Sequence, residues 1–138
     1  LEIKYNEKQP ASNQLFFTSW VKEIDHVLAG LDIIALTSLN EGTPVTLIEA
    51  KASKKPIIST DVGGVKDVIF HKETGILTES DNIDDFSKKL KELVDNKALQ
   101  SKIAINGSTD IQQRFSYKRL VEDMRSLYLE LLDNDEIN

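Results

Sequence analysis

Two carboxylates lie on either side of a predicted helix start in the segment "SLNEGTPVTLIEA". Glu41 precedes this start and Glu49 lies within the helix, with seven residues between them. A helix N-terminus carries partial positive charge and unpaired backbone N–H groups, so it attracts anions. A carboxylate accepts two hydrogen bonds and therefore suits a pair of neighbouring hydroxyl groups. The layout fits an anion with a polyol at each end, as in a nucleotide-sugar.

The residues between the two glutamates have the types that such a site requires. Thr43 is the predicted N-cap and Pro44 the first helical residue, where its missing N–H costs nothing. Gly42 allows a ligand to approach the backbone closely, and the free N–H groups of Val45 and Thr46 offer donors to an anion. On spacing alone, the favoured interpretation of the two glutamates is an exposed loop acid and an ordinary solvated helix residue. That alternative stays open at this point.

The composition is that of a globular domain and excludes several classes of protein. The chain has 138 residues, of which 40% are hydrophobic and 29% charged, and its net charge of −6 argues against a nucleic-acid partner. It has no cysteine, so disulfide frameworks and thiolate metal sites are excluded. The only methionine is Met124, so we expect a piece of a longer polypeptide.

Apolar runs alternate with helical patterns along the chain. Strands that are apolar throughout are typical of a parallel sheet covered on both faces. The fold class expected is therefore α/β, a Rossmann-like doubly wound parallel sheet, of which this chain is the second half. The predicted strands are residues 14–19, 32–38, 55–60 and 74–78, and the predicted helices are residues 20–31, 44–53, 82–96, 98–114 (interrupted at Gly107) and 117–132, with a short helical segment within 61–70.

The segment "NEGTPVTLIEAKASKKPIISTDVGGVKDVI" resembles the donor-binding core of retaining glycosyltransferases with the GT-B fold, in the large family numbered four. The shared pattern is Glu-Gly, a short turn, an aliphatic run, Glu-Ala, a proline before an apolar strand, and Gly-Gly near an acid. "LAGLDIIALTS", "HKETGIL" and "RFSYKRLVEDMRSLY" extend the likeness over residues 14–132, the expected partial C-terminal domain. Residues 1–13 are the expected linker and 133–138 the expected flexible tail.

The resemblance assigns roles to the two glutamates and the segment between them. It implies that Glu41 binds the hydroxyls of the donor sugar and is the candidate catalytic residue, and that Glu49 holds the ribose hydroxyls. The backbone of residues 42–46 would cradle the sugar and the diphosphate.

Two further pairs of residues receive roles from the same resemblance. Trp20 and Val21, at the end of the first predicted strand, would lie against the nucleotide base, although a core position for Trp20 is favoured. Gly63 and Gly64 would allow close backbone packing beside the cleft.

The implied activity is transfer of a sugar from a nucleotide-sugar, most commonly a UDP-sugar, to a glycan or lipid-linked glycan, with retention of configuration. No metal or other cofactor is expected. An N-terminal domain of the same polypeptide, absent here, would bind the acceptor, and a loop upstream of this chain's start would supply an Arg and a Lys for the diphosphate. The fragment alone is therefore expected to be inactive. A cytoplasmic location is implied, and association of the intact enzyme with the inner face of the membrane is compatible with it.

Some residues depart from the family pattern or receive no functional role. Lys51 replaces the usual methionine, and Lys54 or its neighbour the usual glycine; we interpret both as structural, at a helix end that favours cations. His26 and His71 lack metal-ligand spacing. The apolar stripe of residues 117–132 is interpreted as a packing surface that also has the reach to contact the absent domain.

Two other functions remain as alternatives. One is a nucleotide-sugar epimerase on a related two-domain fold. The other is a non-enzymatic flavodoxin-like interaction module, which would carry a phosphorylatable aspartate at a strand end, whereas Asp32 begins its strand.

Overall fold

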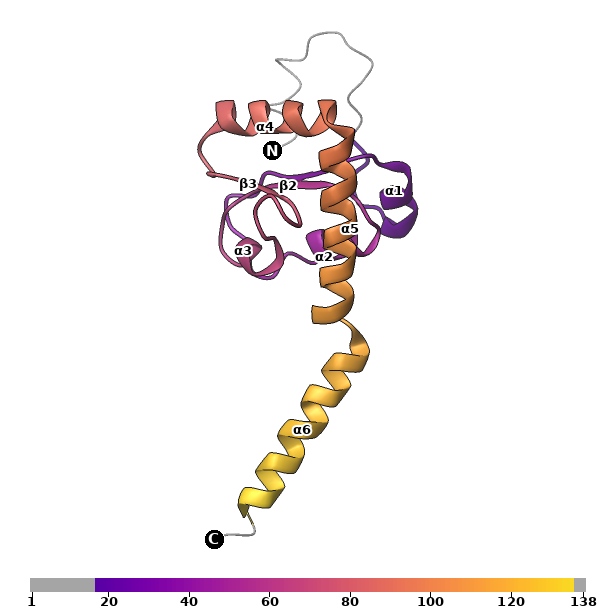
Figure 1. Cartoon of the computed structure of the whole chain (residues 1–138), viewed down its shortest axis with the longest axis vertical. Helices are drawn as coiled ribbons and strands as arrows, with labels where there is room; N and C mark the ends of the chain where they lie inside the picture. Colours follow the sequence, from indigo (N-terminus) through magenta and orange to yellow (C-terminus); the bar gives the residue numbers. More distant parts are fainter. Residues whose placement is uncertain (1–16, 136–138) are drawn as a thin grey trace.

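The fold is built on a parallel sheet of three strands in the order β1-β2-β3, seen in a computed structural model that describes residues 17–135 (Figure 1). The strands are β1 (Ile34–Leu36), β2 (Ile57–Thr60) and β3 (Ile76–Thr78). Ile34 pairs with Ile57, and Ile58 with Ile76. The predicted α/β class with a parallel sheet is confirmed.

Helices cover both faces of the sheet because the central strand, β2, presents apolar side chains on both of its faces. Neighbouring residues of a strand point to opposite faces. Ile57 belongs to a core cluster that includes residues of α1 (Ile24–Gly30), α2 (Val45–Ala52) and α3 (Val65–Val68). Ile58 belongs to a second cluster with residues of α4 (Ile83–Asp95) and α5 (Lys97–Arg114). The sheet is thus doubly wound.

The N-terminal elements differ from the predicted ones. Residues 17–19 form neither a strand nor a helix, so the strand predicted at 14–19 is wrong over this part, and residues 14–16 lie outside the described ones. The helix predicted from Trp20 begins at Ile24. The apolar run of 14–19 is typical of a strand, but Phe17 is exposed and belongs to neither core cluster of the described residues.

Asparagine and serine side chains begin the helices of the C-terminal half. Asn82 accepts a hydrogen bond from the Asp85 amide over 3.0 Å, and Asn96 accepts one from the Leu99 amide over 2.9 Å. Ser116 precedes the last helix, α6 (Tyr117–Asp135), and its hydroxyl accepts a hydrogen bond from the Arg119 amide over 3.3 Å.

The predicted interruption at Gly107 is wrong, because α5 runs unbroken through this residue. Gly107 is buried where α5 passes α2. A Cβ added there would lie 3.4 Å from Cγ of Lys51 and 3.5 Å from the carbonyl oxygen of Thr74. The glycine reflects a close helix contact and not the end of a helix.

Helix α6 extends away from the α/β body (Figure 1). Its apolar stripe does not pack against the other described residues, so the predicted packing is wrong for this part of the chain. Within residues 17–135, no helix is both long and apolar enough to cross a membrane. The exposed apolar residues of α6 are Tyr117, Leu120, Val121, Met124, Leu127, Tyr128, Leu129, Leu131 and Leu132.

The structure describes only part of the predicted tail and none of the predicted linker. Residues 133–135 of the predicted tail complete α6, whereas residues 136–138 lie outside the described part. The predicted linker, residues 1–13, also lies outside it.

Candidate functional site

The loops that follow β1 and β2 meet at the carboxyl edge of the sheet. The Thr60 hydroxyl donates a hydrogen bond to the Ser38 carbonyl over 2.6 Å. The Gly64 amide donates one to the Glu41 carbonyl over 3.1 Å. Ligands of open parallel sheets bind at this edge. The structure therefore brings together the two loops that the sequence singled out.

The contact between these loops is so close that only glycine fits. Gly63 has a φ of +51°, and a Cβ added to it would lie 1.9 Å from the Glu41 carbonyl oxygen. A Cβ on Gly64 would lie 2.1 Å from the Gly42 carbonyl oxygen. The close backbone packing expected of this glycine pair is present, and its partner is the backbone at Glu41 and Gly42.

Glu41 is half-buried and held by a hydroxyl that the sequence reasoning missed. The Ser38 Oγ donates a hydrogen bond to the Glu41 Oε1 over 2.6 Å. Ser38 is fixed in turn through its carbonyl to Thr60 of β2. A hydroxyl three positions before a candidate acid was the available signal. This pairing restrains the Glu41 carboxylate beside the end of β1.

The start of α2 lies one residue later than predicted. Pro44 is the N-cap, with φ −75° and ψ 96°, so the assignments of Thr43 as N-cap and Pro44 as first helical residue are wrong. The Pro44 carbonyl accepts the first helical hydrogen bond, from the Leu47 amide over 3.0 Å. Val45 and Thr46 are exposed and occupy the first helical positions, where amides have no intrahelical acceptor.

Glu49 lies within α2, between residues that fix the helix to the core. Leu47 and Ala50 are fully buried, whereas Glu49 is half-buried. The helix carries its acid on a side that retains access to solvent. This position leaves the Glu49 carboxylate accessible to a ligand.

Trp20 and Val21 precede α1 instead of ending a strand. Trp20 is 87% exposed, so the favoured core position is wrong, and Val21 is half-buried. The proposed contact of these residues with a base stays a prediction.

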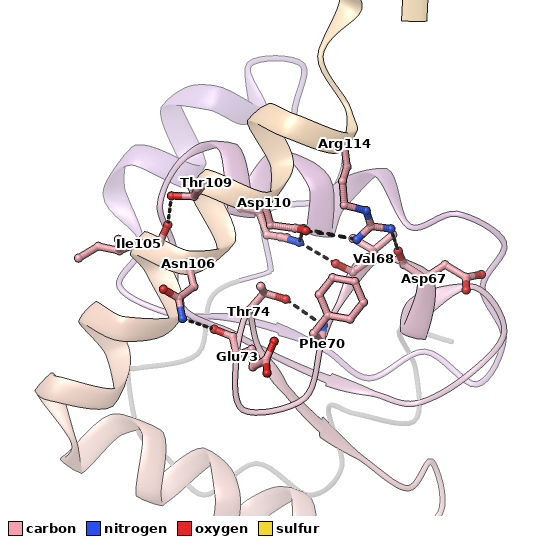
Figure 2. Close-up of polar contacts among 11 residues, drawn as sticks. Asp67, Val68, Phe70, Glu73, Thr74, Ile105, Asn106, Thr109, Asp110 and Arg114 are labelled. Carbon is pink, nitrogen blue, oxygen red and sulfur yellow. Dashed lines mark hydrogen bonds and ion pairs between the residues drawn. The ribbon is translucent and has the colours of Figure 1, made fainter. Parts of the chain in front are cut away.

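Asp110 and Arg114 of α5 lie near the end of α3 (Figure 2), and they share a polar cluster with a buried lysine that the sequence analysis placed at a helix end. Lys51 is 1% exposed; its Nζ donates to the Val68 carbonyl over 2.7 Å and forms an ion pair with Asp110. Burial lowers the pKa of Lys51, and the hydrogen bond and charge of Asp110 oppose this shift. Lys51 follows Leu47 by four positions, which was a signal that it shares the buried face.

The two histidines have no metal-binding surroundings. His26 lies in α1 beside Glu23 and Asp25, all exposed. The His71 Nδ1 accepts a hydrogen bond from the Leu77 amide over 2.9 Å. Across residues 17–135, no group of three His, Asp or Glu side chains is placed to hold a metal ion.

Comparison with known proteins identifies a family and a set of solved folds. The family model described as "Glycosyl transferases group 1" matches residues 2–110. The UDP-Gal:alpha-D-GlcNAc-diphosphoundecaprenol alpha-1,3-galactosyltransferase of Escherichia coli is 27% identical over 135 residues, covering 96% of this chain and 35% of that protein. This chain spans about a third of the length of the first curated relatives that it matches.

Solved structures match the same region. The C-terminal domain of a glycosyl transferase group 1 family protein from Francisella tularensis is 30% identical with a TM-score of 0.66, over 75% of this chain and 53% of that one. Anabaena HepE, in a complex with UDP and glucose, has a TM-score of 0.73 at 22% identity, over 83% of this chain and 32% of that one. The second likeness supports the fold alone. The fold is that of a GT-B C-terminal domain.

Proposed function

The chain belongs to the glycosyl transferases group 1 family, and from this premise we propose that it forms the donor-binding part of an enzyme that uses a nucleotide-sugar. The observation that carries the proposal is the junction at which the Gly63–Gly64 turn packs on the backbone of Glu41 and Gly42. This junction places Glu41 directly before the start of α2, with Glu49 farther along the same helix.

The donor diphosphate lies at the N-terminus of α2 in this proposal. The amides of Val45 and Thr46 donate to it, and the positive end of the helix dipole offsets its charge without a metal ion. Glu41 accepts hydrogen bonds from the sugar hydroxyls and Glu49 accepts them from the ribose. Each carboxylate thereby binds one end of the donor.

UDP is the proposed nucleotide. The name of the Escherichia coli relative contains UDP-Gal. The exposed ring of Trp20 is available to contact the base. The acceptor is a glycan or a lipid-linked glycan, and transfer proceeds with retention, as the family resemblance implies.

The remainder of the enzyme is the proposed partner of α6. Nine apolar side chains of α6 are exposed, and the chain spans about a third of its relatives' length. Burial of such a stripe is favourable in proportion to the apolar area removed from water. In the intact polypeptide, α6 packs on the domain that binds the acceptor, at the cytoplasmic face of a membrane if the acceptor is a lipid-linked glycan.

Incubation of the intact protein with UDP-sugars, with and without acceptors, tests this function. The expected result is sugar transfer that requires an acceptor. Conversion of the UDP-sugar to its epimer without an acceptor would indicate the epimerase instead. Failure to bind or consume any nucleotide-sugar would contradict both.

A further inference from the structure

Helix α3 is held at both of its ends. At its start, the Gly64 amide donates to the Glu41 carbonyl over 3.1 Å. At its end, the Val68 carbonyl accepts a hydrogen bond from the Lys51 Nζ over 2.7 Å. With only four residues, α3 is a short connection between these two contacts. A displacement at the Val68 end would therefore be expected to reach the loop that carries Glu41.

Lys51 is itself fixed by a network on α5 (Figure 2). Its Nζ pairs with Asp110, whose carboxylate oxygens each lie 3.5 Å from Nη1 of Arg114. The Nη2 of Arg114 donates to the Asp67 carbonyl over 2.5 Å, and its guanidinium lies 4.9 Å from the centre of the Phe70 ring. The carbonyls of Asp67 and Val68, the last two residues of α3, are thus each bound by a cationic side chain.

The hydrogen bonds of the two cations are better suited to fixing geometry than to adding stability. Burying a lysine carries a desolvation penalty, and an apolar side chain of similar size is often equally stabilising at such a site. A directional hydrogen bond to one carbonyl, however, allows a single placement of the residue that accepts it. The lowered pKa of Lys51 is consistent with this penalty.

Lys51 also belongs to the helix that carries Glu49. It follows Glu49 by two positions in α2 and fixes that helix against α5, at the point where Gly107 allows close approach. One side chain therefore restrains both elements of the candidate site: the Glu41 loop through α3, and Glu49 through α2.

We infer that Lys51 is a positioning residue for the donor site, acting on Glu41 through α3 and the Gly63–Gly64 turn; the inference rests on the proposed function for the identity of the ligand. Lys51 does not contact the donor in this scheme. Its loss displaces the groups that do.

The test compares Lys51→Met with Lys89→Met in the intact protein. Lys89 is a matched control because its Nζ also binds a carboxylate and a carbonyl, those of Asp85 over 2.8 Å and Leu77 over 3.2 Å, on the opposite face of the sheet. Methionine keeps the length of the side chain and removes the charge. Calorimetric titration with UDP is expected to show about tenfold weaker binding for Lys51→Met and less than about twofold change for Lys89→Met.

Hydrogen exchange supplies a readout that does not depend on the ligand. Peptides that span residues 61–68 contain the Gly64 amide, and this amide is expected to exchange faster in Lys51→Met but not in Lys89→Met. Equal exchange in the two variants, or none faster than the parent protein, would overturn the inference. If the parent protein binds no UDP, the proposed function fails while the exchange comparison still decides the positioning role.

A second variant covers the case in which Lys51→Met does not fold. Lys51→Met combined with Asp110→Asn removes both charges and leaves no unpaired buried ion at that pair. The same faster exchange at residues 61–68 is expected, and parent-like exchange in the folded double variant would contradict the inference.

Discussion

The amide of Gly64 and the carbonyl of Glu41 are joined by a hydrogen bond of 3.1 Å, which fixes the turn after β2 to the loop after β1. Residues 23 positions apart in the sequence thereby form one backbone unit beside the start of α2. The position of the candidate catalytic acid depends on a turn that bears no reactive group.

Alanine at Gly63 is expected to lower the free energy of unfolding by at least about 2 kcal/mol, since its Cβ meets backbone and its φ is positive. The added Cβ would lie 1.9 Å from the Glu41 carbonyl oxygen, which cannot move without the loop. Urea unfolding measures the change. Gly30→Ala is the control, because nothing lies within 4 Å of its added Cβ; an equal loss there would contradict the steric explanation.

Glycine at Lys54 is expected to raise the free energy of unfolding by about 0.5–1 kcal/mol. Lys54 has a φ of +55° at the end of α2, where its amide donates to the Lys51 carbonyl and the Lys55 amide to the Ala50 carbonyl. Glycine adopts this left-handed conformation without a Cβ penalty. Thermal or urea unfolding measures this change. The control is Ser53→Gly: Ser53 has a φ of −82°, so glycine there should not raise the free energy of unfolding.

Stability is expected to fall as the pH drops below about 6.5, through His71. Partial desolvation of the exposed His71 ring and the charges of Lys89 and Lys72 lower its pKa, against the opposing charges of Asp85 and Asp61. The unfolded chain therefore binds the proton more readily than the folded one. The contribution of His71 to the free energy of unfolding is complete above the pKa that this residue has in the unfolded chain. It is lost as the pH falls through the pKa that His71 has in the folded protein.

Urea unfolding at about pH 7.5 and about pH 5 measures this dependence. His71→Gln removes the titrating ring and should reduce the difference between the two pH values. The explanation is wrong if the variant keeps the whole difference.

Substitutions of Glu41 and Glu49 are expected to change different kinetic parameters. In the intact enzyme, Glu49→Gln is expected to raise the donor KM about tenfold, whereas Glu41→Ala mainly lowers kcat, because in the proposed function only Glu41 contacts the reacting sugar. Glu92→Gln, on the exposed side of α4, is the control. Steady-state kinetics with varied UDP-sugar distinguish these effects, and parent-like kinetics for both acids would reject their assignment.

The sheet and most helices followed from the sequence because burial on both faces leaves strands such as Ile57–Thr60 apolar throughout. Local sequence patterns gave wrong predictions where contacts between residues far apart in the sequence determine the structure. Gly107 reads as a helix breaker, yet it reflects the approach of α2. Residues 17–19 read as strand, yet they have no partner strand among the described residues.

The sequence indicated the residues of the candidate site, but not the side-chain contacts that hold these residues in place. The acids, the glycine pair and the helix start have types and spacings that indicate chemistry. Lys51 resembles an ordinary cation at a helix end, and its partner Asp110 lies 59 positions away, beyond any local pattern. Ser38, three positions before Glu41, offered a local signal, but only the fold shows that its hydroxyl lies 2.6 Å from the Glu41 carboxylate.

Residue-resolved NMR titration of the intact protein with UDP tests the central claim most directly. We expect the amide shifts to centre on residues 41–49 and on Gly63 and Gly64, with Glu49→Gln weakening the response. Saturable shifts confined to residues far from the α2 start, or UDP binding unchanged by Glu49→Gln, would contradict the placement of the donor between the two acids.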